Sequence, residues 1–242
     1  MSFWVKLRKI LKNHIFREDY TCSCCQKENF NNKLLCDDCE SKLERIGANR
    51  CSHCGRALKV SQDYCSTCKG VLLSTTTGKS VFNYKDTIAL LIQRFKYNGA
   101  SYLAEYFAKD MANLYFKNYY ASDYLTFVPM TKRAQRKRGY NQSQLLANAL
   151  SKIVNVPVYD GIEKVKKTKR QAKLGRKERR KNLDGAFKVV DKKTIKGKLV
   201  TIIDDVTTTG STIEVLANRL LKAGAKEVKF LTIASVPPSC GY

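Results

Sequence analysis

The fold is decided by residues 200–212, which read Val-Thr-Ile-Ile-Asp-Asp-Val-Thr-Thr-Thr-Gly-Ser-Thr. The apolar first half predicts a buried strand, and the hydroxyl-rich turn around Gly210 predicts the entry into a helix. In sheets of parallel strands, ligands bind in the loops at the carboxyl ends of the strands. The backbone N–H groups of such a turn, its hydroxyls and the helix N-terminus together suit a phosphate dianion.

Two acidic residues precede this turn. Asp204 and Asp205 would repel a phosphate, so we expect them to bind neutral sugar hydroxyls or a magnesium ion. A phosphate at one end and a diol at the other describe a ribose 5-phosphate. An alternative is that the acidic pair belongs to a metal site of another kind, or that the hydroxyls only cap the helix. The candidate ligand-binding residues are Asp204, Asp205, Thr207, Thr208, Thr209, Gly210, Ser211 and Thr212.

Helical and strand patterns alternate along the rest of the chain. Helices are predicted over residues 86–97, 101–116, 142–154 and 212–223. Strands are predicted over 126–130, 186–190, 199–203 and 228–234, with further strand material at 156–159 and Ile162. This alternation predicts an α/β fold, a mainly parallel sheet flanked by helices on both faces.

Nine of the ten cysteines lie between residues 22 and 68, in two four-cysteine units of the same spacing. Paired C-x-x-C turns form a tetrahedral sulfur cage that suits zinc, and a closed four-thiolate site is structural. Disulfides and an iron–sulfur cluster are the competing interpretations. Cys24 lies between two of the proposed ligands and is an alternative ligand. The proposed ligands are Cys22, Cys25, Cys36 and Cys39 for one zinc, and Cys51, Cys54, Cys65 and Cys68 for the other.

Three segments follow from these patterns. Residues 1–20 are predicted to form a basic amphipathic helix, 21–74 a double zinc-ribbon module, and 75–242 the α/β domain. The hydroxyl run 74–77 with Gly78 is interpreted as a linker or hairpin at the boundary. Lysines and arginines interrupt the apolar face of residues 1–16, which argues against a signal peptide and favours a cytoplasmic protein. That helix either docks on protein or lies on a membrane surface.

The chain is strongly basic, with a formal net charge of +24, or about +20 with two four-thiolate zinc sites. Its hydrophobic content of 43% excludes wholesale disorder. Residues 132–138 and 164–181 concentrate the positive charge, far more than one pyrophosphate needs, and a single DNA strand matches such a surface better. A solvated charge run is the alternative. Tyr97 and Tyr140 are candidates for base stacking. The candidate nucleic-acid-binding residues are Lys132, Arg133, Arg136, Lys137, Arg138, Lys169, Arg170, Arg176, Arg179 and Arg180.

The loop at 200–212 resembles the signature of the type I phosphoribosyltransferase fold. The resemblance implies a site for phosphoribosyl pyrophosphate with magnesium, in which Asp204 and Asp205 hold the ribose hydroxyls and residues 207–212 the 5-phosphate. It also implies a pyrophosphate loop at 128–132 and a mobile hood loop at 166–181.

The double cysteine ribbon, Phe95-Lys96-Tyr97, Gly139-Tyr140-Asn141-Gln142 and the run 182–187 together resemble the ComF/ComFC family of bacterial competence proteins. The resemblance implies a role in natural transformation. It implies handling of incoming single-stranded DNA with a partner helicase and recombination mediators, and peripheral membrane association through a larger complex.

Two functions therefore stand as hypotheses. The first is a DNA-uptake and processing protein that binds single-stranded DNA and retains a phosphoribosyl-ligand site. The second is an active phosphoribosyltransferase acting on a base that the sequence does not identify, and no catalytic residue is assigned for it.

Overall fold

The computed structural model describes residues 21–69, 76–118, 121–166 and 183–237. The chain divides into two compact units, residues 1–43 and 44–242, and each is described by itself. The predicted helix at 1–20 and most of the basic run at 164–181 lie outside the described residues. Among the described helices, none is long and apolar enough to cross a membrane.

The described part of the first unit is a small cysteine-bearing loop structure. A single antiparallel bridge joins Thr21 and Glu28, and one short helix follows, α2 (Asp37–Ser41). Leu35 and Leu43 are its buried leucines among the described residues. With so few buried apolar side chains in this described part, a metal bound by the cysteines would supply much of the folding energy.

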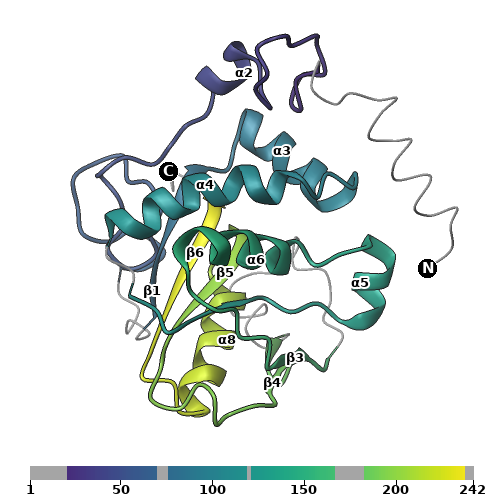
Figure 1. Cartoon of the computed structure of the whole chain (residues 1–242). Helices are drawn as coiled ribbons and strands as arrows, with labels where there is room; N and C mark the ends of the chain where they lie inside the picture. Colours follow the sequence, from purple (N-terminus) through teal and green to yellow (C-terminus); the bar gives the residue numbers. More distant parts are fainter. Residues whose placement is uncertain (1–20, 70–75, 119–120, 167–182, 238–242) are drawn as a thin grey trace, which may run out of the picture. The chain divides into compact units, whose positions relative to one another are not determined.

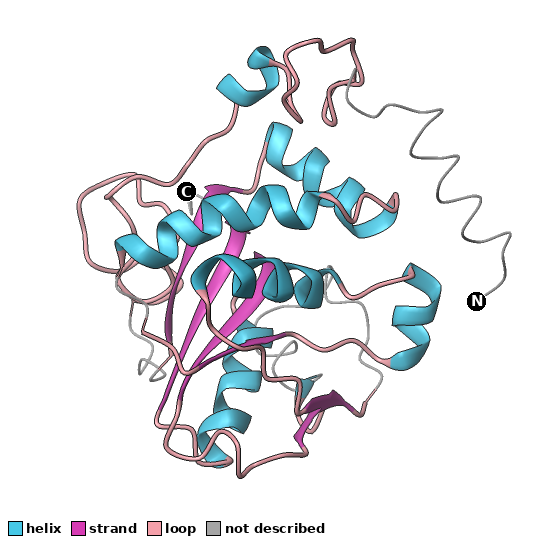
Figure 2. Ribbon diagram, in the orientation of Figure 1, coloured by secondary structure: helices cyan, strands magenta, loops and turns pink. Residues whose placement is uncertain are grey.

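The second unit is built on a four-stranded parallel sheet, as expected from the alternating pattern (Figures 1 and 2). Its order is β1-β6-β5-β2. The strands are β1 (Thr77–Asn83), β2 (Tyr124–Phe127), β5 (Leu199–Thr207) and β6 (Glu227–Ser235). A separate antiparallel pair is formed by β3 (Ile162–Lys164) and β4 (Phe187–Val189).

Helices cover both faces of this sheet. On one face, α8 (Ser211–Lys222) packs on alternate residues of β5 and β6, among them Ile202 and Phe230. The other face is covered by α4 and α6, which also pack on each other (Figure 1). The remaining bounds are α3 (Asp86–Tyr97), α4 (Leu103–Lys117), α5 (Lys132–Arg138) and α6 (Gln142–Val154).

Most predicted elements of the α/β domain are confirmed. The helices predicted at 86–97 and 142–154 are α3 and α6, and apolar residues at helical spacing, such as Leu91 and Phe95, are fully buried. The strand predicted at 199–203 is longer than expected, because β5 continues through both acidic residues to Thr207 while it pairs with β6.

One local prediction is wrong. Residues 77 and 78 do not form a linker or hairpin but begin β1, because they pair in parallel with Lys229 and Phe230 of β6. The strand predicted at 186–190 is confirmed as β4, which pairs with β3 outside the main sheet. The strand material predicted at 156–159 is confirmed in part, since Val158 forms one parallel bridge with Leu125 of β2.

The second four-cysteine unit, residues 51–68, lies in the same compact unit as the sheet. The amide of Gly78 in β1 donates a hydrogen bond to the carbonyl of His53. Gly55 has a φ of +67°, and a Cβ there would lie 2.3 Å from the Cα of Lys79. The knuckle therefore packs directly on the backbone of the edge strand.

Replacing Gly55 tests this packing. We expect Gly55→Ala to lower the free energy of unfolding by about 2–4 kcal/mol, because the new Cβ meets backbone and the left-handed conformation is strained. Denaturant unfolding followed by circular dichroism measures the effect. Gly47→Ala is the control, since a Cβ at Gly47 meets nothing within 4 Å. Equal stability of the two variants would contradict the contact.

Candidate functional site

Each four-cysteine group brings its sulfurs together. In both groups the ligand atoms lie within 4.8 Å of one another. The Sγ atoms of Cys25 and Cys36 are 3.8 Å apart, and those of Cys54 and Cys65 are 3.7 Å apart. Zinc–sulfur bonds of about 2.3 Å in a tetrahedron place sulfurs about 3.8 Å apart, whereas a disulfide needs about 2.05 Å. The donor sets fit two structural zinc ions.

The environments of the sulfurs favour thiolates at selected positions. Burial opposes ionisation of Cys22, but the backbone N–H groups of Cys36, Cys25 and Cys24 donate to the Cys22 Sγ, and the pKa of Cys22 falls to about 6. A hydrogen bond from Cys68 is the main reason that the pKa of Cys54 falls to about 5. A bound zinc would supply the positive charge that crowded thiolates require.

Cys24 is not part of the first group, which consists of Cys22, Cys25, Cys36 and Cys39. Its backbone N–H instead donates to the Sγ of Cys22. The alternative in which Cys24 replaces a ligand is therefore not the arrangement in the structure.

Zinc counting tests the ligand choice. We expect Cys24→Ser to retain two zinc ions per chain and Cys25→Ser to retain one, because only Cys25 belongs to a four-sulfur cage. Zinc released from the denatured protein is measured with a chromophoric chelator. A Cys24→Ser protein that loses one zinc would show that Cys24 is the ligand.

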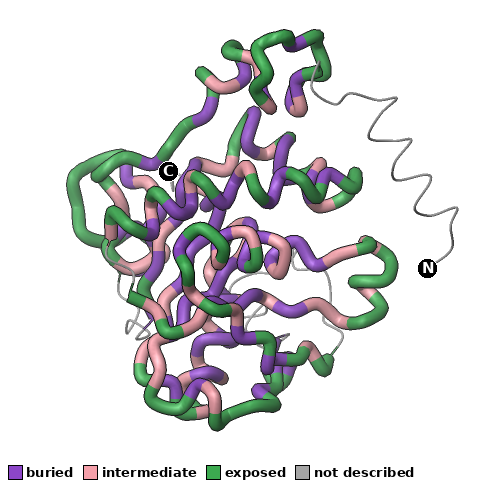
Figure 3. The backbone as a smooth tube through the Cα atoms, in the orientation of Figure 1, coloured by how far each residue is buried: buried purple, intermediate pink, exposed green. Residues whose placement is uncertain are grey.

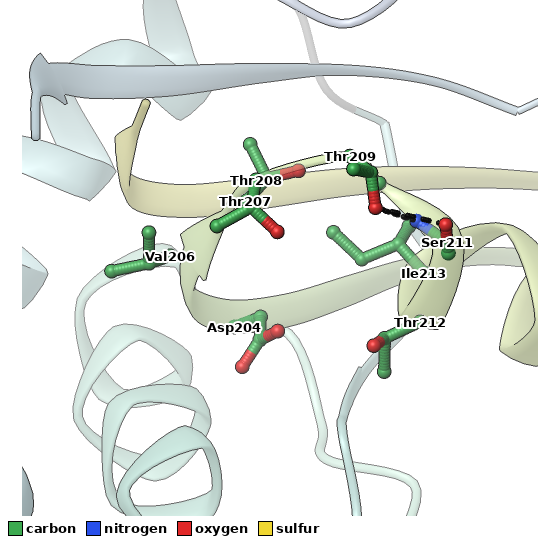
Figure 4. A pocket seen from close by; sticks show the side chains of 9 residues that line it. Asp204, Val206, Thr207, Thr208, Thr209, Ser211, Thr212 and Ile213 are labelled. Atoms are coloured by element: carbon green, nitrogen blue, oxygen red, sulfur yellow. Dashed lines mark hydrogen bonds between the residues drawn. The ribbon is translucent and has the colours of Figure 1, made fainter. Parts of the chain in front are cut away.

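The loop that joins β5 to α8 forms a small cavity at the carboxyl edge of the sheet (Figure 4). Gly210 is the N-cap residue of α8 with a φ of +75°, and no side chain caps the helix there. The side chains of Thr209 and Ser211 hydrogen-bond each other at 2.9 Å. The cavity has a volume of about 70 Å³ and is lined by Asp204, Val206, Thr207, Thr208, Thr209, Gly210, Ser211, Thr212 and Ile213. A polar cavity at a helix N-terminus suits a phosphate group.

The side chains of Asp204 and Asp205 point to opposite sides of β5, contrary to the expectation that both face the ligand. Asp204 lines the cavity, but Asp205 does not and is only 3% exposed. Successive side chains of a strand point to opposite faces, so β5 cannot present both to one side. The Asp205 carboxylate instead pairs with the ammonium of Lys96 at 2.8 Å.

Asp204 is held in place by neighbouring hydrogen-bond donors. It accepts hydrogen bonds from the hydroxyl of Ser143 at 2.7 Å and from the amide of Asp205 at 2.9 Å. Burial is the main cause that raises its pKa to about 7, and the charge of Asp205 adds to it. Of the two acids, Asp204 is thus the one whose carboxyl group lines the cavity.

Lys96 is a site residue that the charge and spacing analysis missed. Burial disfavours its charge, but the Asp205 carboxylate outweighs that cost, and the pKa of Lys96 is raised. Removal of one partner of a buried pair leaves an uncompensated charge. In the sequence, Lys96 stood out only as part of Phe95-Lys96-Tyr97, one of the motifs that carry the family resemblance.

The raised pKa of Asp204 has a consequence for stability. The unfolded chain releases this proton near pH 4, whereas the folded protein keeps it to about pH 7. Its contribution therefore favours folding at low pH and is lost as the pH rises to about 7. We expect the free energy of unfolding of Asp204→Asn, relative to that of the original chain, to rise by about 1–2 kcal/mol as the pH is raised from 5.5 to 8.

Urea unfolding at several pH values measures this difference. Asp184→Asn, at a carboxylate whose side chain is 83% exposed, is the control and should follow the original chain. A constant difference between Asp204→Asn and the original chain across that range would contradict the assignment.

The segment after β2 leads into an exposed basic helix. Asn141 donates to the carbonyl of Val128 at 3.1 Å, and Thr131 caps α5 by accepting from the amide of Ala134. Figure 3 shows α5 without a buried residue. The structure thus places Lys132, Arg133, Arg136, Lys137 and Arg138 on one exposed helix, whereas Lys169, Arg170, Arg176, Arg179 and Arg180 lie outside the described residues.

The two tyrosines proposed to stack bases differ in their surroundings. Tyr140 donates its hydroxyl hydrogen bond to the carbonyl of Phe95 and packs on the Phe95 ring, so it serves the fold. Tyr97 is 70% exposed, and the Arg138 guanidinium lies 5.0 Å from its ring centroid. Arg138 also donates to the Oε1 of Gln142 at 2.7 Å. Tyr97 is therefore the tyrosine with an accessible ring beside the basic helix.

A second cavity, of about 470 Å³, lies between the segment after β2 and β3. Lys164 lies on the wall of this cavity. Partial burial lowers the pKa of Lys164, although the negative charge of Asp204 acts in the opposite direction. Its wall is formed by Phe127, Pro129, Met130, Lys132, Gln135, Asn141, Gln144, Asp160, Ile162, Glu163, Lys164 and Val165. The mixed lining offers apolar contact and hydrogen-bonding groups together.

Comparison with known families agrees with this geometry. The family model described as "Phosphoribosyl transferase domain" matches residues 141–239, and "Double zinc ribbon domain" matches residues 16–69. The protein is thus a double zinc ribbon followed by a phosphoribosyltransferase-type domain. A purine phosphoribosyltransferase from Pyrococcus horikoshii is 23% identical over 55% of this chain and 73% of its own, with a TM-score of 0.35.

Comparison with individual proteins identifies the family within this class. Competence protein F of Haemophilus influenzae is 31% identical over 208 residues, which cover 83% of this chain and 90% of the relative. Competence protein ComFC of Bacillus subtilis is 28% identical over 78% of this chain and 79% of its own length. DNA utilization protein YhgH of Escherichia coli O157:H7 is 29% identical over 81% and 87%, respectively. The chain belongs to this ComF/ComFC family of competence proteins.

Proposed function

We propose that this protein acts in DNA uptake and processing during natural transformation, binding single-stranded DNA along α5 while it holds a phosphoribosyl ligand in the β5–α8 loop. The observation that carries the proposal is α5 itself. Five of its seven residues are basic, none is acidic, and none is buried. A short helix with no buried face contributes little to the core, so we infer that this charge serves binding.

Several features support a nucleic acid strand as the occupant. Single-stranded nucleic acid is held by a positive surface along the backbone and by aromatic rings for the bases. α5 supplies the charge, and Tyr97 supplies an exposed ring beside Arg138. The structure describes no helix that presents a base-reading pattern, so we expect binding that tolerates many sequences.

The β5–α8 loop supports the ligand part of the proposal. Its amide groups and hydroxyls suit the 5-phosphate, and Asp204 suits the ribose hydroxyls or a magnesium ion. Magnesium, when bound, would neutralise pyrophosphate oxygens. The role of Asp205 in this site is to pair with Lys96 and fix the end of β5.

The relatives' names, which refer to competence and to DNA utilization, agree with such a role. The proposal extends to partners of the same process, a helicase and recombination mediators, and to membrane association through a larger complex. Four-thiolate zinc sites are favoured in a reducing compartment, which supports action in the cytoplasm.

Charge reversal on α5 tests the DNA role. We expect Arg133→Glu with Arg136→Glu to weaken single-stranded DNA binding about tenfold or more, and to reduce the salt slope by about 0.7 for each phosphate that the protein no longer neutralises. Fluorescence anisotropy of a labelled oligonucleotide across a salt series measures both. Added phosphoribosyl pyrophosphate and magnesium report whether the two sites are coupled.

The matched control reverses two exposed lysines of α4, Lys109→Glu with Lys117→Glu, which changes the net charge equally. If both double variants weaken DNA binding equally, the effect comes from the net charge of the protein and not from α5. Unchanged binding in the α5 variant would refute α5 as the DNA site.

The second candidate function is phosphoribosyl transfer to a base. The 470 Å³ cavity favours it, because its mixed lining has the size and chemistry for a planar ring. Release of pyrophosphate with a defined base, lost in Asp204→Asn, would favour this enzyme. If the protein does not bind DNA even at low salt, phosphoribosyl transfer becomes the favoured function.

A further inference from the structure

Arg56 joins the second four-cysteine unit to the phosphate-binding loop. Its guanidinium donates one hydrogen bond to the carbonyl of Thr208, in the loop after β5, and one to the hydroxyl of Thr67 at 3.4 Å. Arg56 lies two residues after the ligand Cys54 and is only 5% exposed. A knuckle of the zinc ribbon thus reaches a residue that lines the ligand cavity.

The burial of this arginine points to a specific counter-charge. Buried charges are stable only when they are paired or well hydrogen-bonded, and the Nε of Arg56 has no hydrogen-bond partner among the described residues. A zinc ion bound by four thiolates carries a net charge of about −2. Together with the hydrogen bond from Cys68, the positive charge of Arg56 helps to lower the pKa of the Cys54 thiol, so the second four-thiolate site supplies a negative group beside Arg56.

The contact also fixes the orientation of a peptide in the loop. The carbonyl of one residue and the N–H of the next point in opposite directions across a trans peptide. Because the Thr208 carbonyl points to Arg56, the amide of Thr209 points away from it. Loss of Arg56 removes the hydrogen bond that holds this carbonyl in place, and a carbonyl turned towards the ligand would repel phosphate where an N–H would bind it.

The knuckle that carries Arg56 is itself held on β1. His53 accepts a hydrogen bond from Gly78, and Gly55 lies against the backbone of Lys79. These contacts and the metal fix the position of the Arg56 backbone. From this backbone position, the guanidinium reaches the carbonyl of Thr208 in the loop.

We propose that Arg56 is a positioning residue for phosphate binding, through which the second zinc site and the phosphoribosyl-ligand site are coupled. The inference rests on the proposed function, since it concerns the same ligand site. By linkage, the coupling is reciprocal: zinc strengthens ligand binding, and the ligand slows loss of that zinc.

Calorimetric titration of ribose 5-phosphate tests the positioning role. We expect Arg56→Gln to retain two zinc ions and the melting behaviour of a folded protein, but to bind ribose 5-phosphate about tenfold more weakly. Hydrogen exchange of the amides at 206–212 should be faster in this variant. Arg56→Lys keeps the charge with a single donor group and should bind with intermediate affinity. Lys59→Gln, an exposed position of the same cysteine unit, is the control and should match the original chain.

The reciprocal arm follows zinc release to a chelator. Cys36→Ser with Cys39→Ser in the first unit leaves one zinc, which isolates the second site. Phosphoribosyl pyrophosphate should slow release of this zinc in that background, and should not do so once Arg56→Gln is added. This arm keeps the test decisive if Arg56→Gln alone weakens the fold, because each protein is compared with itself with and without ligand.

The outcomes separate the two proposals. If the original chain binds neither ribose 5-phosphate nor phosphoribosyl pyrophosphate, the ligand site and this inference are both overturned. If the original chain binds and Arg56→Gln binds equally well, with unchanged exchange at 206–212, only the inference is overturned. A ligand effect on zinc release that persists in Arg56→Gln also overturns it.

Discussion

A buried carboxylate is costly unless a cation pairs with it, and the pairing of Asp205 with Lys96 meets this constraint. β5 is an inner strand, flanked by β6 and β2 along the sheet. Its carboxyl end carries two adjacent acids, which alternation sends to opposite sides. The ion pair ties α3 to β5 and neutralises one acid, so the other remains for the cavity. The site at the end of β5 depends on this division of roles.

The functional elements gather at one edge of the sheet because all four main strands run parallel. The segment after β2 leads to the basic helix, and the segment after β5 forms the small cavity at the start of α8. Asn141 holds the first of these segments, while Ser143 holds Asp204 near the end of β5, and both residues belong to the start of α6. The start of α6 thus connects the surface that carries positive charge with the cavity at the end of β5.

How far the sequence predicted this arrangement depended on how local each signal was. The strand, turn and helix at 200–212 were predictable because every feature lies within thirteen residues. β1 was not, because its first residues are Thr, Gly, Lys and Ser, and only pairing with β6 makes them a strand. The helix at 132–138 has no apolar periodicity to detect, since none of its residues is buried.

The site was predictable only in part for the same reason. Residues 207–212 line the cavity as expected, but the opposite roles of Asp204 and Asp205 depend on a lysine 109 residues earlier in the chain. Arg56 belongs to a different motif from the loop that it contacts, 152 residues away. Such contacts follow from the tertiary fold and have no counterpart in local spacing.

The two halves of the cysteine repeat look alike in sequence, yet they belong to different compact units. In the second half, the backbone takes part in the packing of β1, and one side chain hydrogen-bonds the ligand loop. Over evolutionary time, a substitution in the second half must therefore suit the packing of β1 and the loop after β5 as well as the spacing of the cysteines. The second half is committed to this domain and can change only together with it.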